Sequence, residues 1–150
     1  MAIVAAAALF AYAHSMSVPP TSGSKAISRV TIGTTTVAVE VADTEAAREQ
    51  GLSDRPSLAA GHGMLFIFDA PQQAGFWMKD MRFDLDMLFA DQSGRIVTIY
   101  SDVPASSYNA SNPQASQVFY PSAPVTYVLE VPAGFAKAHG IAEGQTIVLK

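Results

Sequence analysis

After residue 25 the chain consists largely of short stretches in which apolar and polar positions alternate. Residues 37–41 alternate valine with alanine and glutamate, and Leu85, Met87 and Phe89 fall on one face of a second such stretch. A period of two residues is typical of a half-buried β-strand. The pattern predicts about eight short strands, at residues 27–32, 37–41, 64–68, 76–78, 85–90, 96–100, 127–131 and 146–149.

Two segments carry helix signals. Asp43 or Thr44 is a suitable N-cap for a helix that Gly51 would end, and residues 135–139 predict a short helical turn. Strands and helices do not alternate regularly, so a doubly wound parallel sheet is not expected. The predicted fold class is mostly β (α+β): a small antiparallel β-barrel or sandwich with one or two short helices.

The N-terminal 24 residues differ from the rest because they contain no Lys, Arg, Asp or Glu. Residues 2–13 form an apolar run of 12, which suits the hydrophobic region of a secretory signal and is short of the ~20 residues that span a bilayer. No basic residue precedes this run, and a buried N-terminal helix is the alternative. We expect a leader and linker at residues 1–24 and a single globular domain at residues 25–150. That domain would be exported, with the periplasm as its compartment, and would keep no transmembrane anchor after leader removal.

Composition removes several classes of function. The 150 residues include no cysteine, which excludes disulfides, thiolate zinc sites and a cysteine nucleophile. The net charge of −4 lacks the basic excess that nucleic-acid backbones attract. The charge therefore predicts no nucleic-acid partner. The chain also has no glycine-rich phosphate loop and no G-x-S-x-G elbow, and we predict no cofactor.

Several motifs occur in an order that resembles a known family. They are Gly63-Met-Leu-Phe66, Phe76-Trp-Met-Lys79, Leu85-Asp86 and Val128-Leu-Glu130. This order resembles the domain of unknown function 192 family over roughly residues 28–149. The resemblance implies a bacterial or archaeal domain, in many members exported, with no assigned activity. The chain departs from the family's usual G-L-M, K-N-T and I-P-L-D motifs, at Ser53, Asp80–Met81 and Phe83–Asp84.

Two carboxylates stand where the strand pattern calls for apolar side chains. Asp86 lies between Leu85 and Met87, and Glu130 lies between Leu129 and Val131. A lone buried carboxylate costs several kcal/mol by order of magnitude, so each needs a partner or an opening to water.

Two cations from other segments, Arg48 and Lys79, are possible partners of these carboxylates. One interpretation is that the four residues form salt bridges that fix the fold. The other is that they line a pocket for an anionic or polyhydroxy ligand.

Trp77, the only tryptophan, is either a core residue or a surface on which a ligand stacks. His62, Met64 and Met78 suggest a soft metal site, although methionine also fills apolar cores. The predicted ligand-binding set is Arg48, Trp77, Lys79, Asp86 and Glu130.

Three functions remain open from the sequence. The first is a small exported binding or accessory module for a polar ligand or an envelope protein, with the uncharged loop 103–125 as a lid or contact surface. The second is an envelope hydrolase that uses Asp86 and Glu130 as acid and base. The third is a purely structural interaction domain. Whether the protein is an enzyme is left undecided.

Overall fold

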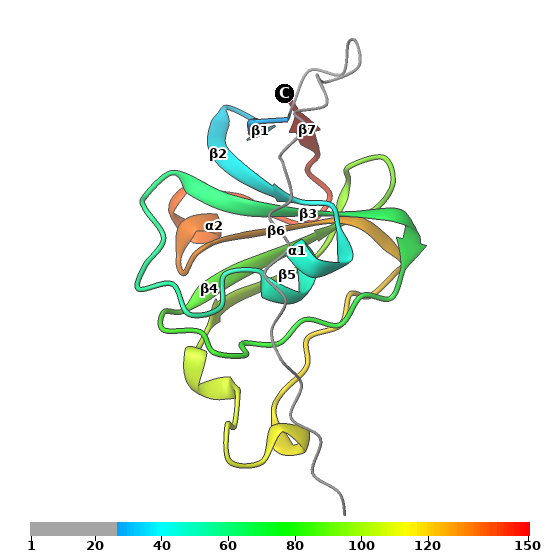
Figure 1. Cartoon of the computed structure of the whole chain (residues 1–150). Helices are drawn as coiled ribbons and strands as arrows, with labels where there is room; N and C mark the ends of the chain where they lie inside the picture. The colour runs from blue at the N-terminus through cyan, green and yellow to red at the C-terminus, as the bar shows by residue number, and fades with distance from the viewer. Residues whose placement is uncertain (1–26) are drawn as a thin grey trace, which may run out of the picture.

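The computed structural model of the chain describes residues 27–150, so the leader and linker expected at residues 1–24 lie outside the described residues. This part contains seven strands in one sheet, two short α-helices and two 3₁₀ turns (Figure 1). The strands are β1 (Arg29–Ile32), β2 (Thr35–Ala42), β3 (His62–Gln72), β4 (Leu85–Ala90), β5 (Ile96–Val103), β6 (Val125–Pro132) and β7 (Ile147–Leu149). The helices are α1 (Glu45–Gln50) and α2 (Phe135–Ala138), and the 3₁₀ turns are η1 (Ala105–Ser107) and η2 (Pro113–Ala115). No helix in residues 27–150 has both the length and the apolar character that crossing a membrane requires.

The sheet is curled into a half-barrel with the strand order β5-β4-β6-β3-β2-β1-β7. The two edge strands of this order, β5 and β7, approach each other at one end. There the Gly144 N–H donates to the Ile96 carbonyl, and the Ile147 N–H donates to the Gly94 carbonyl, each over 2.8 Å. These bonds join the two edges of the sheet, which is how barrels protect unpaired strand edges. The predicted mostly β fold with two short helices is therefore confirmed.

Two local expectations need correction. Residues 76–78 do not form a strand of the sheet, because only Phe76 pairs, in an isolated bridge with Phe119. The β2–β3 pair is parallel, although the rest of the sheet is antiparallel. A parallel pair needs a crossover connection, and residues 43–61, with α1, provide it.

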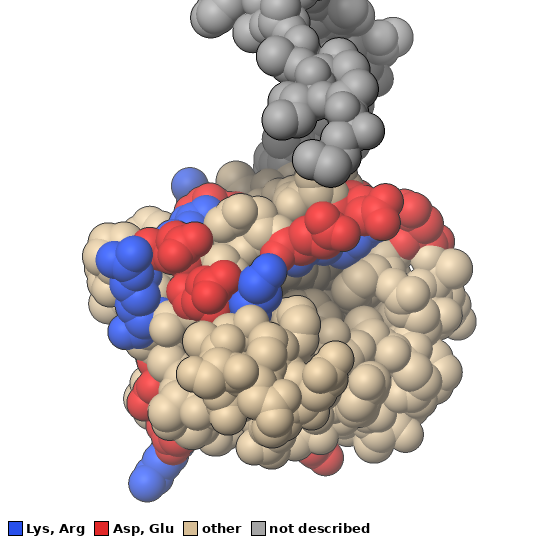
Figure 2. Space-filling view, turned by 60° about the horizontal axis from the view of Figure 1, so that its bottom comes forward, with Lys and Arg blue, Asp and Glu red and all other residues tan. Residues whose placement is uncertain are grey.

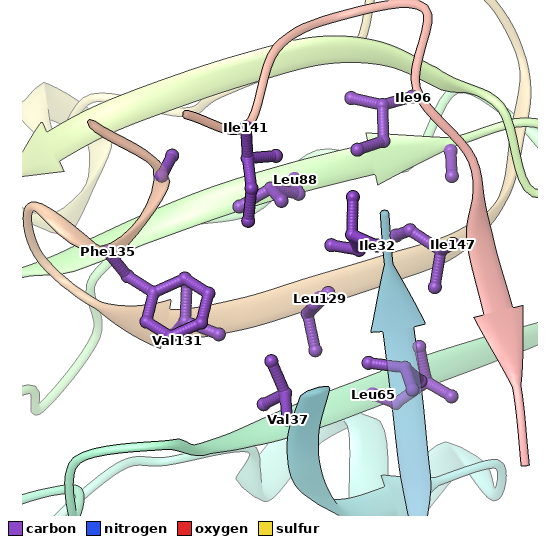
Figure 3. Packing of buried hydrophobic residues seen from close by; sticks show 13 residues of the cluster. Ile32, Val37, Leu65, Leu88, Ile96, Leu129, Val131, Phe135, Ile141 and Ile147 are labelled. Atoms are coloured by element: carbon purple, nitrogen blue, oxygen red, sulfur yellow. The ribbon is translucent and has the colours of Figure 1, made fainter. Parts of the chain in front are cut away.

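One hydrophobic core fills the concave side of the curled sheet. Figure 3 shows its side chains pointing toward one another from strands on all sides and from α2. We call this the inner core, and its buried members include Val30, Ile32, Val37, Leu65, Leu88, Ile96, Leu129, Val131, Phe135, Ile141 and Ile147.

A second hydrophobic core covers the convex side of the sheet, beneath α1 and the connections between strands. We call it the outer core, and its buried members include Leu52, Met64, Phe66, Met78, Leu85, Met87, Phe89, Phe119 and Val128. Helix α1 has no buried residue of its own, and the fully buried Leu52 just after it anchors it to the outer core. The β4 and β6 strands are covered on both faces, so alternate residues of each strand enter different cores.

Asp86 lies on the inner-core face of β4 and is fully buried. Its carboxylate accepts three backbone N–H bonds: one from Asp102 (2.8 Å), one from Gly134 (3.0 Å) and one from Ala136 (2.8 Å). Two of these donors lie at the start of α2, Gly134 as its N-cap residue and Ala136 in its first turn, where free N–H groups need acceptors. Asp86 therefore fastens α2 and the end of β5 to the centre of the sheet.

The Asp86→Asn variant is expected to lose about 2–4 kcal/mol of unfolding free energy, because an amide keeps one acceptor and places an NH₂ group among N–H donors. Urea unfolding of both proteins measures the difference. Asp102→Asn is the matched control: Asp102 is exposed with a φ of 53°, a conformation that asparagine also adopts, so its change should stay within about 0.5 kcal/mol. A change at Asp86 as small as at Asp102 would contradict the fastening role.

Candidate functional site

A pocket of about 480 Å³ opens on the convex side of the sheet, between α1 and residues 72–81. Its size lies within the range of about 300–1,000 Å³ that is usual for small-ligand sites. Figure 2 shows a hollow of the surface beside a row of acidic and basic side chains. Its lining includes Glu45, Arg48, Glu49, Gln50, Phe66, Phe68, Gln72, Gln73, Gly75, Phe76, Trp77, Lys79, Met81 and Glu130.

Helix α1 forms one wall and is fixed at both ends. The Thr44 hydroxyl caps its first turn by accepting the Ala47 N–H over 3.2 Å. From its last turn, Arg48 Nη1 donates to the carbonyls of Asp43 (2.7 Å) and Ile67 (2.8 Å), and its guanidinium lies 5.3 Å from the centre of the Phe68 ring. Arg48 thus ties the helix to β3.

Residues 72–81 form the opposite wall, and hydrogen bonds hold them to the segment after α1. The Ser53 hydroxyl donates to the Lys79 carbonyl over 2.8 Å, and the Asp54 N–H donates to the Asp80 carbonyl over 2.9 Å. Asp80 has a φ of 55°, a left-handed conformation that favours Asn, Asp and Gly. Hydrogen bonds between protein groups therefore hold both walls in place.

Glu130 forms part of the pocket floor. It projects from β6 on the outer-core face, where it pairs with Met64 of β3 on one side and Met87 of β4 on the other. The residue is only 4% exposed, and within residues 27–150 its carboxyl has neither a hydrogen bond nor an ion pair. Burial among apolar neighbours raises the pKa of Glu130 from 4.5 to about 8. The protonated carboxyl offers a pocket ligand one donor and one acceptor.

Trp77 lies at the pocket rim and is 46% exposed, so the interpretation of this residue as core is wrong. Its neighbour Met78 is buried in the outer core, as the alternation of the two faces requires. The indole ring meets the Tyr108 ring edge-to-face, with their centres 5.5 Å apart. One face of the 76–78 segment is therefore open, and it presents an aromatic side chain beside the pocket.

The structure brings four of the five predicted ligand-binding residues to this pocket: Arg48, Trp77, Lys79 and Glu130. Asp86 is not among the lining residues, because the β4–β6 register places it opposite Val131 on the inner-core face. No ion pair joins any of these residues in the described part of the chain, where the ion pairs are Arg55–Glu40 and Arg82–Asp54. The salt-bridge interpretation is therefore wrong.

The suggested soft metal ligands occupy different surroundings. Met64 and Met78 pack in the outer core, whereas His62 is exposed at the start of β3 with its Nδ1 3.2 Å from the Ala60 carbonyl. Among the described residues, no three His, Asp or Glu side chains are grouped so that they could hold a metal ion. Methionine acts here as a core residue.

Sequence reasoning missed the polar residues that surround the pocket mouth. These are Glu45, Glu49 and Gln50 of α1 and Gln72 and Gln73 at the end of β3. Their pattern resembles any solvated surface, and only the crossover that places α1 opposite residues 72–81 brings them together. The one available signal was that α1 has large side chains only of polar type.

Fold and pocket together define a small, mostly β domain with a ligand-sized pocket on the convex face of a curled sheet. The pattern of the DUF192 family (uncharacterized ACR) matches residues 28–149, and the chain belongs to this family. No curated protein is significantly similar to the chain.

Two solved structures are similar along most of their length. One is a protein of unknown function from Novosphingobium aromaticivorans DSM 12444, 28% identical, with a TM-score of 0.70 over 81% of this chain and 84% of that one. The other is described as a proposed transcription regulator from Sinorhizobium meliloti 1021, 33% identical, with a TM-score of 0.69 over 81% of this chain and 90% of that one. Both show that the fold is shared, and neither assigns an activity to this chain.

The raised pKa of Glu130 predicts that stability falls as the pH rises. Between pH 4.5 and about 8 the folded protein holds a proton on Glu130 that the unfolded chain has lost, so the unfolding free energy decreases by up to about 1.4 kcal/mol per pH unit. Glu130→Gln should remove this decrease. Urea unfolding of both proteins from pH 5 to 9 measures the two slopes.

Glu40→Gln is the control for this experiment. The hydrogen bond from Arg55 lowers the pKa of Glu40, so the stability that this residue contributes is lost only as the pH falls through its lowered pKa. The Glu40 variant should keep the wild-type slope above pH 5. Equal slopes for wild type and Glu130→Gln would contradict the effect of burial on Glu130.

Proposed function

We propose that this protein is an exported binding module that holds a polar ligand in the pocket between α1 and residues 72–81. The observation that carries the proposal is the Glu130 carboxyl, which lies at the floor of a ligand-sized pocket and has no hydrogen-bond partner of its own within residues 27–150. The carboxyl opens into the pocket, so a ligand that fills the pocket would remove it from water. Such a ligand must hydrogen-bond to the carboxyl, because a polar group left buried without a partner costs about 1–3 kcal/mol.

The walls support the same proposal. Hydrogen bonds from Arg48, Ser53 and Asp54 fix the pocket walls to β3 and to one another, which limits the ordering that binding would need. Trp77 supplies an exposed aromatic surface at the rim. Export is proposed from the apolar run at residues 2–13, which has the length of a signal segment.

The alternative of a hydrolase with Asp86 and Glu130 as acid and base receives less support. The two residues lie on opposite faces of the sheet, in different cores. An acid and base that act on one substrate must both reach it, and all three backbone contacts of Asp86 are structural. A role as transcription regulator, the description given to the Sinorhizobium protein, is likewise not favoured by a net charge of −4.

The proposal predicts that filling the pocket mouth abolishes ligand binding. Glu49→Phe adds a ring at a lining position of α1, whereas Ala46→Phe adds the same ring at an exposed position that does not line the pocket. Wild type and both variants are expressed in the organism that naturally makes the protein, purified from its cell envelope and examined by native mass spectrometry. We expect a small molecule on wild type and Ala46→Phe, and at least a tenfold lower occupancy on Glu49→Phe.

Two results would contradict the proposal. One is equal retention of the small molecule by Glu49→Phe and Ala46→Phe, which would place the ligand elsewhere. The other is a wild-type protein that carries no small molecule and is bound to a partner protein in fixed stoichiometry, which would favour the interaction domain.

A further inference from the structure

The chemistry of the pocket lining narrows the class of ligand, and the following inference rests on the function proposed above. The charges of the lining are balanced: Glu45, Arg48 and Glu49 line it from α1, and Lys79 lines it from the opposite wall. At the floor, burial raises the pKa of Glu130 to about 8, which leaves its carboxyl mainly uncharged near neutral pH. The two acidic and two basic residues cancel, so the lining has no net attraction for either a cationic or an anionic ligand. The lining therefore favours a ligand without net charge.

Each uncharged hydrogen-bonding group of the lining is planar and carries a donor beside an acceptor. Gln50, Gln72 and Gln73 each present an amide oxygen and an NH₂ group, and the protonated Glu130 carboxyl adds a further donor and acceptor. Gln50 uses part of this capacity in a 3.2 Å bond to the Ser53 carbonyl. Such side-by-side donors and acceptors match ligands that carry hydroxyl groups on neighbouring carbons. A purely apolar ligand would leave the Glu130 carboxyl without a partner.

A row of exposed apolar side chains continues from the pocket mouth. Because Phe76 and Phe119 pair and point inward, their neighbours Trp77, Val118 and Tyr120 face outward, with exposed fractions of 46%, 40% and 55%. The Tyr120 ring lies against Gly75, where a Cβ atom would come within 2.6 Å of the ring. Since Gly75 and Trp77 both line the pocket, the row and the pocket form one continuous surface.

Aromatic faces beside planar hydrogen-bonding groups suit a ring that is apolar on its faces and polar around its edge. A sugar ring has this character. We propose that the ligand is a short neutral oligosaccharide, with one sugar unit in the pocket above Glu130 and the next stacked on Trp77 toward Tyr120. The pocket, at about 480 Å³, gives room for the first unit, and the exposed row gives a surface for the second.

The test is binding to an array of neutral and anionic oligosaccharides, followed by titration calorimetry with the strongest neutral binder. The chain's single tryptophan gives a second readout, because stacking on Trp77 should change its fluorescence saturably.

Trp77→Ala should weaken binding at least tenfold in calorimetry, and Tyr120→Ala should weaken it less. Glu130→Ala should also weaken it at least tenfold, and Glu130→Gln, which keeps a donor and an acceptor, should restore most of the affinity. Val148→Ala, exposed on β7 and not part of the pocket lining, is the control.

The outcomes separate this inference from the proposed function. If the array gives no neutral binder while tri-lysine, citrate or a tetra-alanine peptide binds saturably and Glu49→Phe blocks that binding, the pocket is a binding site and the sugar assignment is wrong. If a neutral oligosaccharide binds equally well to Trp77→Ala, the proposed placement is wrong. If no probe binds and native mass spectrometry finds no small molecule, both the inference and the proposed function are overturned.

Discussion

The burial of β6 on both faces is the constraint on which the rest of the structure depends. This strand lies between β3 and β4, and its alternate residues enter two different cores. Leu129 and Val131 fill the inner core, which the curled sheet and α2 enclose. Glu130 must then point into the outer core, between two methionine side chains. Its carboxyl lies where apolar groups surround it, and the pocket above it is the place where a ligand could reach it.

The two buried carboxylates show how one sequence pattern can have two physical outcomes. Asp86 and Glu130 each stand between apolar neighbours in a buried strand. Asp86 is compensated by three backbone N–H donors and acts as a structural cap. Glu130 has no such donors within residues 27–150, and burial raises its pKa instead. A fold that retains an uncompensated carboxyl loses stability that an apolar residue would provide, and binding is the function that we infer to offset this loss.

Most strands could be predicted from the sequence because the alternation of apolar and polar residues is a local property. Asp86 and Glu130 could be recognised as unusual because they interrupt apolar stretches. The sequence could not show that Asp86 and Glu130 face opposite sides, since this follows from the β4–β6 register, in which Asp86 pairs with Val131. The parallel β2–β3 pair and the place of α1 are also set by tertiary packing. The apolar segment around Trp77 left a core position and an exposed one both open, and the structure decides for exposure because that segment pairs at only one residue. The family match covers residues 28–149, and the family has no assigned activity that could be transferred to this chain.

The central claim is that the Glu130 carboxyl is buried at the floor of the pocket, without a hydrogen-bond or ion-pair partner in residues 27–150. The most direct test is an NMR titration of its side-chain carboxyl carbon in the ligand-free protein, with Glu130→Gln used to assign the signal. The account predicts a titration midpoint near pH 8. A midpoint near 4.5, the ordinary value for glutamate, would mean that water or a cation already compensates the charge, and would contradict the account.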